Sequence, residues 1–172
     1  MSDADAIRIA TERSIKALTL RPAMGLKTAV SRTRVRGGTT CDVEEGRWKI
    51  VADMGETVGG GGLGPDPGVL GRAALGSCLA MGYVIWAAVR GVPLSAVEVE
   101  VQADFDAGAQ YGLGEAPAGY TEVRYRVSIE SPAPEADVMR VIEEAEDRSP
   151  YFDVFTRGQK LVRSVRVVNP GD

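Results

Sequence analysis

Two segments of the chain alternate apolar and polar residues with the period of a β-strand. Residues 94–106 carry valine or alanine at every second position with acidic or amide side chains between them, and residues 120–129 repeat the alternation. A period of two is typical of a strand that buries one of its faces. Because the glycine-rich residues 107–119 connect the two segments, we expect them to pair as antiparallel neighbours.

Shorter alternating stretches predict further strands. The first of them has arginine at positions 32, 34 and 36, so it would present a basic face. A Gly-Gly pair and a Glu-Glu-Gly sequence provide turn signals between it and the next two stretches. The additional predicted strands cover residues 27–36, 39–43, 47–52 and 161–168.

Three segments have the periodicity or composition of helices. Residues 3–18 form a weak amphipathic pattern, and residues 136–148 show apolar residues at helical spacing. Between them lies a long apolar segment, about residues 68–90, which opens after Pro65 and Pro67 and ends at a Gly-Val-Pro sequence. Helices and strands are segregated along the chain, which predicts an α+β fold with antiparallel sheets rather than a parallel doubly wound fold.

This pattern divides the chain into an extension and one domain. We assign residues 1–26 to an N-terminal helical extension and residues 27–172 to a single domain, because 172 residues is an ordinary length for one domain. The long helix is uncharged from residue 73 to residue 89, close to the lower limit for a membrane span. We reject a span because Arg72 and Arg90 bracket the run closely. Its many small residues instead favour close packing against another helix or a symmetry mate.

Charge and the N-terminal residues narrow the range of partners. Twenty basic and twenty-four acidic side chains give a net charge of −4, and no basic block is present. A nucleic-acid partner is therefore not expected. The first residues lack the charged and apolar regions of a secretory signal, so we expect a cytoplasmic protein whose thiols stay reduced.

The chain contains no histidine. This excludes serine-histidine and cysteine-histidine catalysis as well as histidine metal sites. Its two cysteines, Cys41 and Cys78, are too few for a disulfide framework or a four-ligand zinc site. The glycine-rich residues 58–64 match no phosphate-binding motif, and the acidic strand faces fit a solvated surface. We therefore expect no metal and no other cofactor.

Cys78 is the leading candidate for a nucleophile because it lies alone in the apolar central helix. Its neighbours one turn away are Ala74, Leu75, Met81 and Gly82, which make an apolar and uncrowded surround. A free thiol with a pKa of about 8.5 is only slightly ionised at neutral pH, so efficient attack needs a positive neighbour. The alternative is that this cysteine is simply a small buried hydrophobic residue, as free cysteines often are.

The sequence around this cysteine resembles that of a known family. The motifs are Pro65-x-Pro67, then Ala73-Ala-Leu-Gly-Ser-Cys78-Leu-Ala, then Gly91-x-Pro-Leu-Ser and Asp104-Phe-Asp106. In this order they resemble the OsmC/Ohr family of osmotically inducible and organic-hydroperoxide-resistance proteins, over about residues 28–168. The resemblance implies an OsmC-like fold in an intertwined homodimer, with two cysteine-bearing helices at its centre and active sites at the subunit interface.

The resemblance also implies chemical roles. In the family a helix cysteine attacks an organic hydroperoxide, a second cysteine in a Cys-Pro step resolves the sulfenic acid, and an external dithiol completes the cycle. Cys78 matches the attacking cysteine, whereas Ser149 precedes Pro150 at the second position. The family's glutamate after the second proline, which helps to hold an activating arginine, is replaced by Gly68.

Together these observations predict an OsmC-like thiol peroxidase with a single reactive cysteine. Cys78 would be the peroxidatic nucleophile and Arg36, or Arg34 on the same strand, would activate its thiolate. The homodimer would reduce an organic hydroperoxide with an external thiol reductant in oxidative-stress defence. Cys41 is expected to be a strand residue rather than a resolving partner. The alternative is a catalytically degenerate OsmC-fold protein that binds an apolar or thiol-reactive small molecule at the dimer interface, and a purely structural dimer is a third possibility.

Overall fold

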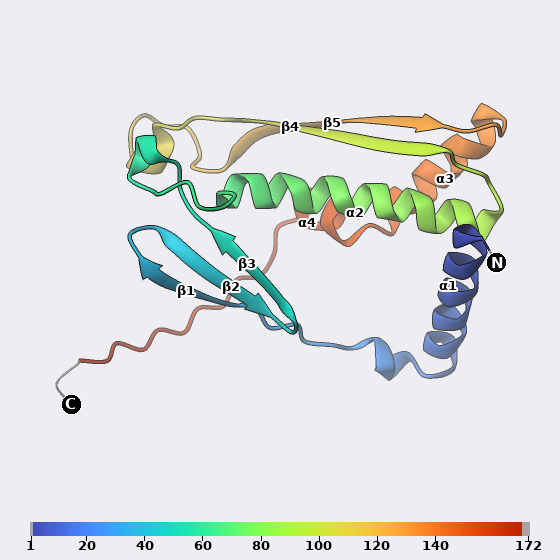
Figure 1. Cartoon of the computed structure of the whole chain (residues 1–172), viewed down its shortest axis with the longest axis horizontal. Helices are drawn as coiled ribbons and strands as arrows, with labels where there is room; N and C mark the ends of the chain where they lie inside the picture. The colour runs from blue at the N-terminus through green and yellow to red at the C-terminus, as the bar shows by residue number, and fades with distance from the viewer. Residues whose placement is uncertain (1, 170–172) are drawn as a thin grey trace.

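The computed structural model describes residues 2–169, which form two antiparallel sheets and four α-helices (Figure 1). Sheet A contains three strands in sequence order and sheet B contains two. The predicted α+β class is confirmed. The strands are β1 (Arg32–Gly37), β2 (Thr40–Glu45), β3 (Trp48–Ala52), β4 (Ala96–Phe105) and β5 (Tyr120–Glu130), and the helices are α1 (Asp3–Leu20), α2 (Pro67–Arg90), α3 (Glu135–Asp147) and α4 (Pro150–Thr156).

Sheet B covers the central helix. Strands β4 and β5 pair antiparallel as predicted, with Val99 opposite Val127 and Val101 opposite Tyr125. These inward-facing side chains pack on a buried cluster from α2 and α3 that consists of Leu75, Leu79, Tyr83 and Ala145. The outward-facing residues of both strands are exposed and include cross-strand ion pairs such as Arg124 with Asp104. The alternation in the sequence therefore marks which face of the sheet is buried.

Helix α2 lies between sheet B and sheet A in Figure 1 and spans the domain. Asp66 caps its start by accepting a hydrogen bond from the Val69 N–H at 2.9 Å, and Pro67 occupies the first turn. It ends at Gly91, whose φ of 69° is left-handed and so favours glycine. Within the helix Gly76 allows close approach to sheet B, because a Cβ there would lie 3.3 Å from a methyl of Val101.

One face of α2 is left uncovered by the residues that the structure describes. It carries apolar and small side chains that are exposed, namely Val69, Ala73, Ser77, Met81, Val84 and Ile85. By its length and composition alone, α2 is long and apolar enough to cross a membrane. Its other sides pack against β4, α1, α3 and α4, so it is the central helix of this domain.

Helix α1 packs against α2, and the division of the chain into an extension and one domain stays a prediction. Ser2 and Asp5 form a reciprocal capping box at its start. It lies against the C-terminal part of α2 in Figure 1, and no residue of α1 is buried.

The prediction of a final strand over residues 161–168 is wrong for the single chain. This segment is an extended coil whose apolar side chains are exposed, with Leu161 93% accessible to solvent. A strand needs a neighbour that satisfies its backbone hydrogen bonds, and neither sheet of the described residues includes this segment. The first strand also begins later than predicted, at Arg32 instead of Lys27.

Helix α4 was not predicted from the sequence. Its start carries a Ser-Pro sequence in which Ser149 is the N-cap and Pro150 lies in the first turn. The helix is only seven residues long, too short for the periodicity that reveals longer helices.

The glycine-rich loop before α2 is packed against the end of sheet A. A Cβ at Gly60 would lie 1.9 Å from the carbonyl oxygen of Met54, and a Cβ at Gly64 would lie 2.1 Å from that of Val51. Both contacts are with backbone, which cannot swing away. The loop therefore needs glycine for close approach, which agrees with its lack of a phosphate-binding motif.

We expect Gly60→Ala to destabilise the protein by about 3 kcal/mol, the upper end of the range for overpacking, because the new methyl group would overlap the Met54 carbonyl. Urea unfolding followed by circular dichroism measures this change. Gly119→Ala is the matched control, since nothing lies within 4 Å of its Cβ position. Equal unfolding midpoints for the two variants would contradict the close packing.

Candidate active site

Cys78 lies at the middle of α2 and is half-buried. Its Sγ is 3.3 Å from the Oγ of Ser149, a residue 71 positions further along the chain. Ser149 is only 6% exposed. The fold thus brings together the two positions that the sequence singled out as the attacking residue and the replaced second cysteine.

The hydroxyl of Ser149 is held in place by the start of α4. Its Oγ accepts a hydrogen bond from the Phe152 N–H at 3.3 Å, and its own backbone N–H donates to the Glu146 carbonyl at 3.1 Å. Both contacts follow from the helix–cap–helix geometry that joins α3 to α4. The side chain consequently has a fixed direction toward the thiol.

An aromatic cavity of about 300 Å³ is lined by residues close in sequence to this pair, although neither Cys78 nor Ser149 lines it. Leu75, one helical turn before Cys78, forms part of its wall. The rings of Tyr120 and Phe155 stack with centroids 6.4 Å apart, and those of Tyr125 and Phe152 meet edge to face at 6.1 Å. The cavity is lined by Leu75, Tyr120, Thr121, Glu122, Val123, Tyr125, Phe152, Phe155 and Thr156. Such walls suit an apolar ligand of modest size.

Arg72 lies close to the place where the sequence lacks the family's glutamate. Its Nη1 donates to the Tyr120 hydroxyl at 3.2 Å, and that hydroxyl donates to the Gly68 carbonyl at 3.1 Å. A Cβ at Gly68 would lie 3.2 Å from the same guanidinium. Sequence reasoning used Arg72 only as the end of the uncharged run. Its helical spacing from Leu75 and Leu79, which are buried residues of α2, indicates that Arg72 lies on the same face of the helix.

Arg36 lies in a different part of the chain, on β1. Its guanidinium is half-exposed and forms an ion pair with Asp42 at 3.6 Å. Arg34 faces Asp42 across the β1–β2 pair. Among the interactions of residues 2–169, none joins Arg36 or Arg34 to Cys78.

The half-buried carboxylate of Glu146 links two tyrosines, one of which, Tyr125, lines the aromatic cavity. The hydroxyls of Tyr83 and Tyr125 both donate to the same oxygen of Glu146, at 2.9 and 3.0 Å. Burial, and then the neighbouring carboxylate, raises the pKa of Tyr125 to about 12, and the same causes raise the pKa of Tyr83 further. Both phenols therefore stay protonated at physiological pH and act as hydrogen-bond donors.

Asp53 ties the hairpin of sheet A to the loop that leads into α2. Its carboxylate accepts hydrogen bonds from the hydroxyls of Thr39 and Thr40 at 2.8 and 3.0 Å. It also accepts from three backbone N–H groups, those of Met54, Gly61 and Leu63. The Thr39 bond in particular, together with these others, lowers the pKa of Asp53 to about 2, against the effect of its burial. The side chain is ionised at any physiological pH although it is only 2% exposed.

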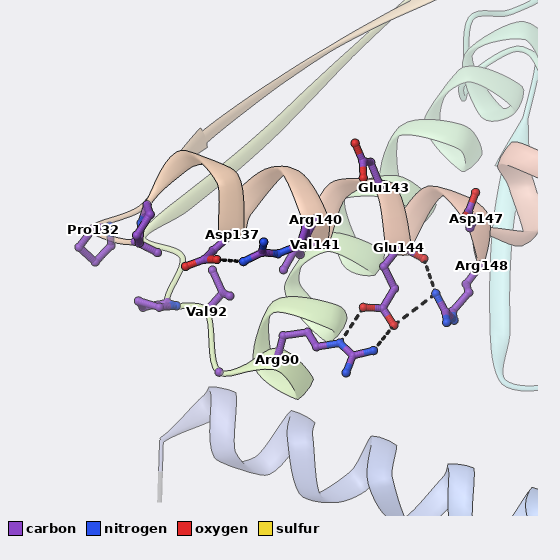
Figure 2. A pocket seen from close by; sticks show the side chains of 14 residues that line it. Arg90, Val92, Pro132, Asp137, Arg140, Val141, Glu143, Glu144, Asp147 and Arg148 are labelled. Atoms are coloured by element: carbon purple, nitrogen blue, oxygen red, sulfur yellow. Dashed lines mark hydrogen bonds and ion pairs between the residues drawn. The ribbon is translucent and has the colours of Figure 1, made fainter.

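A larger cavity of about 950 Å³ lies at the far end of α2 (Figure 2). Arg90 forms a two-bond ion pair with Glu144, at 2.7 and 2.6 Å, and Arg148 approaches the same carboxylate at 3.3 Å. The pKa of Glu144 is lowered, chiefly by the hydrogen bond from Arg90. This cavity lies about 18 Å along the helix from Cys78. It is therefore separate from the thiol.

The part of the chain that the structure describes contains no group of three or more cysteine, aspartate or glutamate side chains placed to hold a metal ion. The chemistry that this site offers is that of one thiol beside a buried hydroxyl and an apolar cavity.

These features define an α+β protein with a cysteine on its central helix. The family model described as OsmC-like protein matches residues 59–162, more than half of the chain. The chain belongs to this OsmC-like family, as the motif around Cys78 predicts. No curated protein matches the chain.

Solved structures show the same fold at low sequence identity. The OsmC-like protein from Mycoplasma pneumoniae has a TM-score of 0.64 at 14% identity, covering 76% of this chain and 88% of its own. An organic hydroperoxide resistance protein OsmC from Legionella pneumophila has a TM-score of 0.55 at 19% identity, covering 76% and 90%. An OsmC-like protein of unknown function from Vibrio cholerae has a TM-score of 0.60 at 13% identity, covering 75% and 94%. The family thus includes neighbours named for hydroperoxide resistance.

We expect Asp53→Asn to lower the urea midpoint at neutral pH, because an amide cannot accept all five hydrogen bonds. The pKa of Asp53 is depressed in the folded protein, so its contribution is full above the unfolded value near 4 and fades as pH falls toward 2. Urea unfolding of the parent and the variant between pH 7 and pH 2 measures this difference. The exposed Asp147→Asn change is the control, and a difference from the parent that is independent of pH would contradict the assignment.

Proposed function

We propose that this protein is a thiol-dependent peroxidase that reduces an organic hydroperoxide with Cys78. One observation carries this proposal: the half-buried Sγ of Cys78 lies 3.3 Å from the buried hydroxyl of Ser149. An aromatic cavity is lined by Leu75, one helical turn before Cys78, and by Phe152, whose backbone N–H donates to Ser149. Membership of the OsmC-like family, with neighbours named organic hydroperoxide resistance proteins, supports the proposal. The apolar walls of this cavity favour peroxides with an organic group over hydrogen peroxide.

The proposed first step is attack by the thiolate on one peroxide oxygen. An S–O bond forms as the O–O bond breaks, the sulfur loses two electrons, and the alkoxide leaves and takes up a proton to become an alcohol. The product on the protein is a sulfenic acid at Cys78.

An external thiol then completes the cycle. It displaces water from the sulfenic acid to form a mixed disulfide, and a second thiol releases Cys78 and leaves as an external disulfide. In this proposal Cys41 is not the resolving partner: it lies on β2, and among residues 2–169 its Sγ contacts the carbonyl of Thr39 at 3.5 Å and not Cys78. Ser149 has no sulfur. The reductant therefore has to come from outside the chain.

The proposed activator of the thiolate is Arg36. Its ion pair with Asp42 is exposed and 3.6 Å long. Little free energy is therefore lost when the guanidinium leaves Asp42 to bind another anion. The place for such a contact is the interface of a homodimer, where the family's active sites are expected.

The proposed homodimer covers the free face of α2. A second copy supplies an apolar partner for the exposed residues of this helix, including Val84 and Ile85. It also supplies a sheet edge for residues 161–168, whose alternating apolar side chains are exposed in the single chain. Both features suit an intertwined pair.

A binding protein without turnover is the second candidate. The presence of Ser149 and Gly68, where the family carries a cysteine and a glutamate, favours it. In that case the aromatic cavity would hold an apolar or thiol-reactive molecule, and the parent protein would bind it without consuming peroxide.

We expect Cys78→Ser to abolish consumption of cumene hydroperoxide in the presence of dithiothreitol, while Cys41→Ser retains it, because Cys78 is the proposed nucleophile and lies one helical turn from Leu75 in the cavity wall. A peroxide assay and circular dichroism of each variant measure activity and folding. Arg36→Ala should slow the reaction at pH 7 about tenfold, the effect of losing one nearby positive charge, whereas Arg34→Ala should change it little. A parent protein that consumes no peroxide would favour the binding protein.

We expect Val84→Arg to convert a dimer into a monomer, because a guanidinium at the centre of the free α2 face would be buried without a partner. Sedimentation equilibrium of the parent and the variant measures the mass. Ser128→Arg, on the outward face of sheet B, is the control and should leave the mass unchanged. A parent chain that is monomeric at micromolar concentration would sink the proposed dimer.

A further inference from the structure

The hydrogen bonds of Ser149 leave its hydroxyl proton free for the sulfur of Cys78. A serine hydroxyl has one proton to donate and two lone pairs to accept with. One lone pair accepts the Phe152 N–H at 3.3 Å, and within residues 2–169 the only other polar contact of Oγ is with Cys78 Sγ at 3.3 Å. A thiolate has no proton, so in that state the bond can run only from the serine hydroxyl to the sulfur.

Burial strengthens this hydrogen bond. Ser149 is 6% exposed, so water has little access to replace the hydroxyl on that side of the sulfur. A hydrogen bond to an ionised group stabilises it more strongly than one between neutral groups, and more so away from water.

We propose that the Ser149 hydroxyl donates a hydrogen bond to the Cys78 thiolate and thereby keeps this thiol reactive at neutral pH. The catalytic meaning of this role rests on the peroxidase function proposed above. The serine holds the attacking sulfur in its ionised form, and since it cannot form a disulfide, it leaves the resulting sulfenic acid open to an external thiol. Ser149, at the position of the family's second cysteine, thus acts on the attack on the peroxide instead of on the resolution of the sulfenic acid.

The test is the pH dependence of Cys78 alkylation by iodoacetamide in a Cys41→Ser background. We expect Ser149→Ala to slow alkylation about tenfold at pH 7, the usual strength of a hydrogen bond to a charged group. At high pH, where the thiol is ionised with or without the bond, the rates should agree within about twofold. Ser149→Thr keeps a hydroxyl and should restore the parent profile.

Ser77→Ala is the matched control. Its hydroxyl lies on the same helix next to Cys78 but donates to the Ala74 carbonyl at 3.3 Å, so its loss should leave the profile unchanged. A Ser149→Ala profile that coincides with that of the parent, or that is slower by the same factor at every pH, would overturn the proposal.

Two further variants keep the test decisive if alanine disturbs the start of α4. Ser149→Gly also removes the hydroxyl, and glycine at an N-cap lowers helix stability only slightly, so it should reproduce the shifted profile. Ser149→Cys tests the contact itself: oxidation should join it to Cys78, and the intact mass should fall by two hydrogen atoms. Failure of this disulfide to form would show that residue 149 lies too far from the sulfur to donate.

Alkylation involves no peroxide, so the two proposals fail separately. A shifted profile together with no consumption of cumene hydroperoxide would retain the hydrogen bond and remove the peroxidase. Rapid peroxide consumption with an unshifted alkylation profile would retain the peroxidase and remove the hydrogen bond.

Discussion

The carboxylate of Asp53 is the interaction on which the arrangement of the molecule depends. Sheet A and the central helix meet through the loop between them, and the five hydrogen bonds to Asp53 close that loop from both sides. The Thr39 and Thr40 hydroxyls come from the β1–β2 hairpin. The backbone N–H groups of Gly61 and Leu63 come from the glycine-rich segment before α2, and that of Met54 directly follows Asp53. A buried negative charge surrounded by donors has few alternative arrangements of similar energy. The hairpin that carries Arg36 is thereby held in one position relative to the helix that carries Cys78.

Much of the fold could be predicted from the sequence, because the long elements repeat their period many times. The alternation in β4 and β5 marked their buried face, and the apolar run with its two prolines marked α2 to within one residue of its start. The short helix α4 escaped prediction because seven residues span barely two turns. The segment 161–168 has the pattern of a strand but no strand beside it, since a pattern records what a segment can bury and not what is available to cover it.

The candidate site shows the same division between local pattern and tertiary placement. The motif around Cys78 was enough to single out the cysteine and to notice Ser149 as a departure from the family. The 3.3 Å contact between them depends on how α3 and α4 fold back over α2, which no local pattern contains. The aromatic cavity was also hidden, because its walls come from α2, β5 and α4, three elements far apart in the sequence. Arg72 was overlooked because a charge at the edge of an apolar run is usually solvated, whereas here it reaches the hydroxyl of Tyr120.

The shared acceptor at Glu146 has a consequence for the motions of this core. One carboxylate oxygen receives the hydroxyls of Tyr83 on α2 and Tyr125 on β5, while the carboxylate itself belongs to α3. If any one of these elements moves away, a tyrosine hydroxyl or the Glu146 carboxylate loses a hydrogen-bond partner. The free energy of that lost bond then destabilises the packing of the other two elements. Local fluctuations of the three should therefore be coupled, and we expect the slowest-exchanging backbone amides of α2, α3 and β5 to open to solvent deuterium as a single cooperative unit.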